Sequence, residues 1–138
     1  MDLMEWSDSY SVGVEEIDFQ HKAFLALINR LSILQERGTP LLMTHRMLLE
    51  VLKYAEYHFV SEENLMMLTE YPMLSQQQEA HNSLLRALTD RYNAFAKGEE
   101  SLDAILVFLV GWFSSHTVDE DKAAGLYINK YARERAVE

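Results

Sequence analysis

The sequence predicts an all-α protein, an antiparallel up-down four-helix bundle with an N-terminal extended arm and a short C-terminal helix. Four segments carry apolar residues that recur every three or four positions, the spacing of one face of an α-helix. Short connections separate these segments, and most of the five glycines and two prolines lie at the breaks. Amphipathic helices joined by short loops bury their apolar stripes against one another. With 138 residues, 49% of them hydrophobic, the chain is expected to form a single domain over residues 1–138.

The N-terminal part predicts an arm followed by a helix. Residues 1 to about 17 have isolated apolar side chains among polar ones, which is typical of an extended segment. The first helix is expected to begin at Asp18, whose carboxylate can cap it. Apolar residues then recur at helical spacing, at Phe24, Ile28 and Leu31. Gly38 and Pro40 end this helix and start the next one.

The second and third helices are expected at about 40–68 and 75–96, with a break at Tyr71 and Pro72. The inner stripe of the second helix comprises Met47, Val51, Tyr54, His58, Glu62 and Leu65. The inner stripe of the third comprises Gln77, His81, Leu84, Leu85, Leu88, Tyr92 and Phe95. Each stripe therefore carries one histidine among residues that are expected to face the core.

The fourth helix is expected to begin near Ser101, a suitable N-cap residue. Its apolar side comprises Leu102, Ile105, Leu106, Leu109, Trp112, Phe113 and His116. The polarity changes around Val118 and Asp119, and a short last helix is expected to follow to the end of the chain.

One histidine on each stripe, with two carboxylates, forms a candidate metal site: His21, His58, His81, His116, Glu62 and Asp121. His58 and Glu62 are four residues apart and share one helix face. Asp121 follows His116 by five residues, about 140° round an unbroken helix, so it faces the site only if the chain turns or kinks there. Buried imidazoles need polar partners, and a metal centre supplies them together. Histidine and carboxylate ligands suit iron, manganese or zinc. His45 falls on another face and is left out.

These spaced residues resemble the hemerythrins, specifically the bacterial hemerythrin-like domains. The resemblance covers nearly the whole chain, including the arm at Trp6, the segments Asp18–His21 and His58–Glu62, the turn at His81, and the pair His116 and Asp121. It implies a four-helix bundle that holds a non-haem centre of two iron ions with an oxo or hydroxo bridge. Such proteins bind dioxygen reversibly.

The resemblance also implies a role for each site residue. His21 and His58 would hold the iron that receives dioxygen, and His81 and His116 would hold the other. Glu62 and Asp121 would bridge the two ions. Trp112 and Phe113 would wall the oxygen pocket, and Thr117 stands beside that pocket where many relatives have an aliphatic residue.

Gln77 departs from the family pattern, which usually has a histidine four residues before His81. Its amide oxygen is a weak ligand, so this position is expected to be weakly filled or vacant, with Gln76 and Gln78 flanking it. A labile centre favours an oxygen- or redox-sensing domain, which a larger signalling protein could contain. The expected partners are dioxygen or small exogenous ligands.

Composition excludes several other classes. The net charge of −10 argues against nucleic acid and anionic membranes, and the absence of cysteine excludes thiolate sites and disulfides. The apolar run 104–113 is too short to span a bilayer, and no secretory signal is seen, so a cytoplasmic protein is expected.

Three alternative functions stay open. One is an oxygen carrier or storage protein, and another is a metal-free helical interaction module. The third is a di-iron oxidative or peroxidase-type enzyme. That class uses Glu-x-x-His pairs, which the histidines of this chain lack, so an enzyme is not the first choice.

Overall fold

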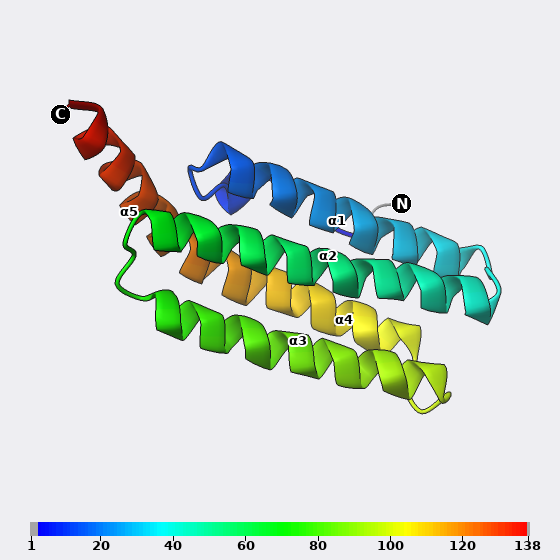
Figure 1. Cartoon of the computed structure of the whole chain (residues 1–138). Coiled ribbons are helices and arrows are strands. Elements are labelled where there is room, and N and C mark those ends of the chain that lie inside the picture. The colour runs from blue at the N-terminus through cyan, green and yellow to red at the C-terminus, as the bar shows by residue number, and fades with distance from the viewer. Residues whose placement is uncertain (1–2, 138) are drawn as a thin grey trace.

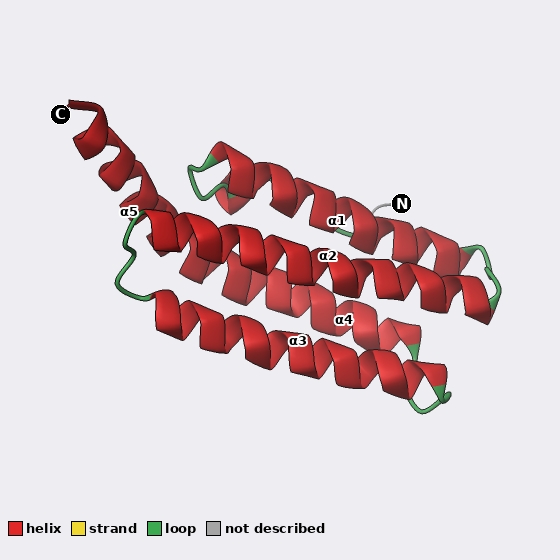
Figure 2. Ribbon diagram, viewed as in Figure 1, coloured by secondary structure: helices red, strands yellow, loops and turns green. Residues whose placement is uncertain are grey.

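The described chain is helical throughout its regular structure and forms an antiparallel bundle (Figures 1 and 2). The computed structural model describes residues 3–137, without the side chains of His116, Val118, Ala136 and Val137. Its helices are η1 (Asp8–Tyr10), α1 (Glu15–Glu36), α2 (Leu41–Leu68), α3 (Leu74–Ala96), α4 (Leu102–Trp112), the π-helical turn η2 (Phe113–Thr117) and α5 (Val118–Val137). The predicted fold class is confirmed.

The start of α1 differs from the prediction. The helix begins at Glu15, and Asp18 lies inside its first turn instead of capping it. The Asp18 carboxylate accepts hydrogen bonds from the Val12 backbone N–H at 2.8 Å and from the Ser11 hydroxyl at 2.5 Å. An acidic side chain near a helix start can bind any donor nearby, and here the folded-back arm supplies two. Asp18 therefore ties the arm to α1.

The arm lies against the bundle along its length and contains one short 3₁₀ helix, η1. Near its start, Met4 exchanges two hydrogen bonds with the Asn29 side chain, at 2.9 Å and 2.7 Å. Near its end, Val12 packs with Ile17 of α1 and Ile128 of α5 in a small apolar cluster. The arm thus joins the first and last helices at the end of the bundle where α5 begins.

The connection from α4 to α5 is a π-helical turn, not a break. Such a turn adds one residue to the helix without interrupting it and shifts every later side chain round the axis. The shift compensates for the five-residue spacing that otherwise directs Asp121 away from the core, and Asp121 is only 4% exposed. The last helix runs from Val118 to Val137, which agrees with the expected bounds, and its end projects beyond α1 and α2 (Figure 1).

The main core contains buried apolar side chains from all four bundle helices, including Ile28, Leu48, Leu88 and Ile105.

By length and composition alone, the continuous helix Leu102–Arg135 is apolar enough to cross a membrane, with a mean hydropathy of 1.2 over its most apolar window. A core helix of a bundle meets the same criterion, and Leu109 and Phe113 of this helix are fully buried.

Two glycines of the last helical stretch offer a matched pair of substitutions. A Cβ added at Gly125 would lie 2.0 Å from the Val12 carbonyl oxygen, whereas one added at Gly111 would meet nothing within 4 Å. We expect Gly125→Ala to displace the arm and to lower the free energy of unfolding by about 1–3 kcal/mol. Gly111→Ala should instead raise it by about 0.5–1 kcal/mol, because alanine is the better helix former. Urea unfolding measures both, and equal effects would contradict the close approach of the arm.

Candidate metal centre

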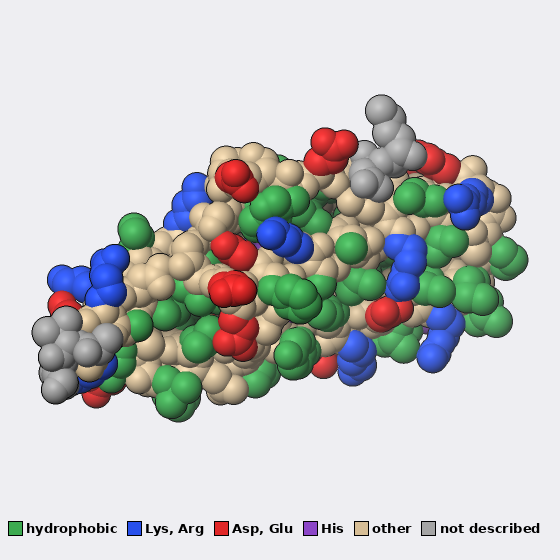
Figure 3. All heavy atoms as spheres, turned by 90° about the horizontal axis from the view of Figure 1, so that it is seen from above, with side chains coloured by type: hydrophobic (Ala, Val, Ile, Leu, Met, Phe, Trp, Pro, Cys, Tyr) green, Lys and Arg blue, Asp and Glu red, His purple; other side chains and the backbone are tan. Residues whose placement is uncertain are grey.

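Four predicted ligands lie together inside the bundle. They are His21 on α1, His58 and Glu62 on α2, and Asp121 on α5, and their ligand atoms all lie within 4.8 Å of one another. All four side chains are buried. Among the described side chains, no histidine is visible on the face of the molecule in Figure 3, which agrees with this burial.

The Glu62 carboxylate is the centre of this cluster and is fully buried. His21 Nε2 lies 3.2 Å from Glu62 Oε1, and His58 Nε2 is in close contact with the same oxygen. His81 Nε2, from α3, lies 3.4 Å from the other oxygen, Oε2. Asp121 Oδ2 lies 3.2 Å from His21 Nε2. Imidazoles from three helices therefore face one carboxylate, and a second carboxylate lies beside them.

A chain of hydrogen bonds sets the orientation of the His58 ring. His58 Nδ1 is 2.7 Å from Gln20 Oε1, Gln20 Nε2 is 2.9 Å from Ser61 Oγ, and Ser61 Oγ is 3.4 Å from Glu16 Oε1. A carboxylate only accepts, so the Ser61 hydroxyl donates to Glu16 and accepts from the Gln20 amide. The Gln20 oxygen then accepts from His58 Nδ1–H. The Nε2 lone pair of neutral His58 consequently faces the centre.

His81 is held in the same way. Its Nδ1 lies 2.8 Å from Glu63 Oε2, and its ring stacks on Phe59 with centroids 4.0 Å apart. Metal-binding histidines commonly donate their second N–H to such an acceptor. An imidazole lone pair that faces a carboxylate repels it unless a proton or a metal ion lies between them, and hydrogen bonds to Glu62 and Glu63 raise the pKa of His81 against the effect of burial. The donor set therefore fits a metal ion of the kind that nitrogen and oxygen ligands prefer.

Burial and neighbouring charges shift the pKa values of these groups. Burial lowers the pKa of His58, which agrees with the neutral ring. Burial alone would lower the pKa of His21, but its hydrogen bonds to Asp121 and Glu62 outweigh burial and raise it to about 9. Burial and the Glu62 charge raise the pKa of Asp121 well above its ordinary value. Against the effect of burial, the nearby histidines hold the pKa of Glu62 well below its ordinary value. Without metal, His21 and Asp121 therefore retain protons that a metal must displace.

Without metal, the protein is expected to lose stability as the pH rises from about 6.5 to 9. The pKa of His21 is about 9 in the folded chain and 6.5 when unfolded, so its contribution is complete below pH 6.5 and is lost above pH 9. The loss is on the order of 3 kcal/mol. Urea unfolding of the metal-free protein across this range measures it. His21→Gln should flatten the dependence, and an equally steep one in that variant would assign it to other groups.

Gln77 lies in the first turn of α3, one turn before His81, and is buried. Its Nε2 donates to the Glu120 carbonyl oxygen at 3.4 Å. Its Oε1 is enclosed and has no hydrogen-bond partner within the described part of the chain. Glu120 directly precedes Asp121, so Gln77 lies beside the candidate ligands with an unused oxygen acceptor.

The three predicted oxygen-pocket residues have different neighbours. Phe113 is fully buried, and its ring packs edge-on against His21 with centroids 5.6 Å apart. Trp112 packs edge-on against Phe24 and Phe59. Thr117 is buried, and its hydroxyl has no hydrogen-bond partner among the described atoms. Phe113 is therefore the wall residue in direct contact with a candidate ligand.

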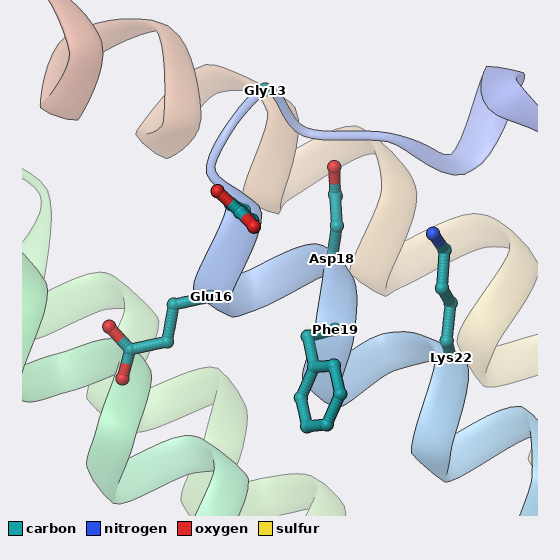
Figure 4. A pocket seen from close by; sticks show the side chains of 6 residues that line it. Gly13, Glu16, Asp18, Phe19 and Lys22 are labelled. Atoms are coloured by element: carbon teal, nitrogen blue, oxygen red, sulfur yellow. The ribbon is translucent and has the colours of Figure 1, made fainter.

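The predicted ligand His116 belongs to the π-helical turn, but its side chain lies outside the described atoms. His45, as expected, faces elsewhere and stacks on Tyr92 with centroids 4.3 Å apart. A surface hollow of about 790 Å³ on α1 is likewise separate from the centre (Figure 4). Its lining includes the exposed Phe19 and also Glu16, which extends toward α2 in the same view.

Sequence reasoning did not find the outer partners Gln20, Ser61 and Glu63. Gln20 directly precedes His21, and Glu63 directly follows Glu62. Each lies about 100° round its helix from the ligand, where it faces a neighbouring helix and not the centre of the bundle. Polar residues beside a ligand stripe were the signal that could have indicated them.

Histidines and carboxylates that converge inside a helical bundle are typical of proteins that hold a metal centre in the bundle core. The profile of one such family, described as the hemerythrin HHE cation binding domain, matches residues 12–125. The chain therefore belongs to the hemerythrin family.

Relatives and solved structures agree with this assignment. A bacteriohemerythrin of Stenotrophomonas maltophilia is 27% identical over 97% of this chain and 90% of its own length. A hemerythrin-like protein of Naegleria gruberi is 27% identical over 84% of this chain and 86% of its own. A crystal structure of a hemerythrin variant superimposes with a TM-score of 0.84 at 25% identity and covers 93% of this chain and 98% of that one.

Proposed function

We propose that this protein holds two iron ions, binds dioxygen at them and serves as an oxygen- or redox-sensing domain. The observation that carries the proposal is the convergence of the His21, His58 and His81 Nε2 atoms on the Glu62 carboxylate. Hemerythrins hold a di-iron centre and bind dioxygen, and the family assignment supports the same use of this cluster.

The two oxygens of Glu62 face different histidines, as a carboxylate that bridges two ions requires. Oε1 faces His21 and His58, which would hold one ion, and Oε2 faces His81, which would hold the other. Asp121 would be the second bridging carboxylate, and His116 would be a further ligand of the second ion. When bound, the irons supply the electrons that dioxygen accepts.

The residues around the cluster favour binding over catalysis. Phe113 and the buried helix faces keep water from the His21 side of the site. Among the described side chains, the buried titratable groups of the cluster are assigned as ligands or as partners of ligands. Gln77 in place of a strong nitrogen ligand supports a labile centre, which suits sensing better than storage.

Metal analysis tests this proposal. Protein loaded with ferrous iron without oxygen and then exposed to air should contain two irons per chain and develop the absorption bands of a bridged ferric pair. His58→Ala should lose both the iron and the bands, whereas His45→Ala, at a histidine outside the cluster, should keep them.

The remaining outcomes separate the alternatives. A helical protein that takes up no iron would support the interaction module. Turnover of an added substrate with peroxide would support the enzyme. Stable, repeated oxygenation without autoxidation would favour the carrier over the sensor.

A further inference from the structure

A small hollow lies next to Gln77, on the α3 side of the centre. Its volume is about 240 Å³, and it lies between the α2–α3 connection, the start of α3 and the first two turns of α5. Its lining residues are Tyr71, Met73, Gln76, Gln77, Glu120 and Ala123. The hollow is large enough for several water-sized molecules.

Gln77 lines this hollow and lies on the same helix as the candidate ligand His81. The side chain is 6% exposed, and it stands one helical turn before His81, so both residues share one face of α3. Its amide Nε2 donates to the Glu120 carbonyl at 3.4 Å, near the distance limit for such hydrogen bonds. The enclosed Oε1 has no partner within the described atoms. A buried acceptor without a partner is costly unless something else, such as a metal ion, uses it.

We propose that the hollow beside Gln77 admits a small monoanion, which binds to the metal held by His81 at the coordination position that Gln77 fills weakly. This inference rests on the proposed function. It assigns to the centre a second site for an exogenous ligand, on the metal farther from Phe113.

The charge of the loaded centre explains why an anion is expected. Two ferric ions bring six positive charges, and two carboxylates with one oxo bridge offset four of them. The remaining positive charge lies in an enclosed site of low dielectric, where it attracts an anion strongly. A neutral amide oxygen offsets none of this charge, so an anion displaces it readily.

Azide titration of the ferric, iron-loaded protein tests the inference. Absorption should show two azide ions bound per chain in the natural protein. Gln77→His should retain both irons and bind only one azide, because the imidazole holds the position firmly. Gln76→His, at the exposed neighbouring residue, should still bind two.

A second variant tests the route independently of the ligand. Ala123 is exposed and lines the hollow, so Ala123→Phe should fill it without replacing a candidate ligand. We expect slower binding of the second azide only, with both irons and the first azide retained. One azide in the natural protein and in Gln77→His alike, with two irons bound, would overturn this inference alone. Failure to bind iron would overturn the proposed function as well.

Discussion

Replacing Glu62 with glutamine is expected to abolish the metal centre. Three imidazoles from three helices face the Glu62 carboxylate, and its two oxygens face different histidines. Glutamine has nearly the same shape, but it is neutral and offers one acceptor oxygen in place of two. The loss of metal affinity should exceed the ~10–100-fold that follows loss of an outer hydrogen-bond partner. Iron per chain after equilibration with a competing chelator measures it.

Glu63→Gln is the matched control for this substitution. Glu63 is adjacent on the same helix and only accepts a hydrogen bond from His81 Nδ1. The glutamine oxygen can still accept that bond, so the affinity should fall by at most about 10–100-fold. Equal losses in the two variants would show that Glu62 does not bridge the ions. Far-ultraviolet circular dichroism should show that both variants keep their helices.

Phe113→Ala is expected to lower the free energy of unfolding of the metal-free protein by about 3–5 kcal/mol. The ring is fully buried and packs against Tyr10, His21 and Phe24. Its removal leaves a cavity between the arm, α1 and the π-helical turn, because those elements cannot all close round the space. Urea unfolding measures the loss. The iron-loaded variant should also autoxidise faster, since water would reach the His21 side of the centre.

Phe19→Ala removes a ring of the same size from the surface of α1, where it is 71% exposed. Its effect on unfolding should lie within about 0.5 kcal/mol. If Phe113→Ala were equally mild, the wall of the site would have to be sought among other residues.

Most of the fold could be predicted from periodicity and a few breakers. The predicted second helix, about 40–68, agrees closely with α2, and Ser101 caps α4 through a hydrogen bond from the Ala104 N–H. Asp18 was misassigned as a cap, because its partners are donors of the arm that only the tertiary fold brings near.

The candidate site could likewise be predicted only in part. His58 and Glu62 share a helix face by spacing alone, and their stripe had to face the core. Whether the Asp121 side chain faces the core depends on whether the chain breaks or forms a π-helical turn after α4. The five-residue spacing from His116 is compatible with either. The outer acceptors Gln20 and Glu63 depend on how α1, α2 and α3 are rotated against one another, which a single sequence does not reveal.

Asp121 lies near one end of α5, and most of the helix extends away from the centre. This residue lies in the first turn of the helix, and the 16 residues that follow extend about 24 Å toward Val137. The far part of this helix projects past the ends of α1 and α2 (Figure 1), where Asn129 donates to the Gly13 carbonyl and Arg135 pairs with Glu70. A rotation of about 5° at the pivot would therefore move the tip by about 2 Å. A displacement of the Asp121 carboxylate that turned α5 would in this way produce a larger displacement at the outer end of the helix.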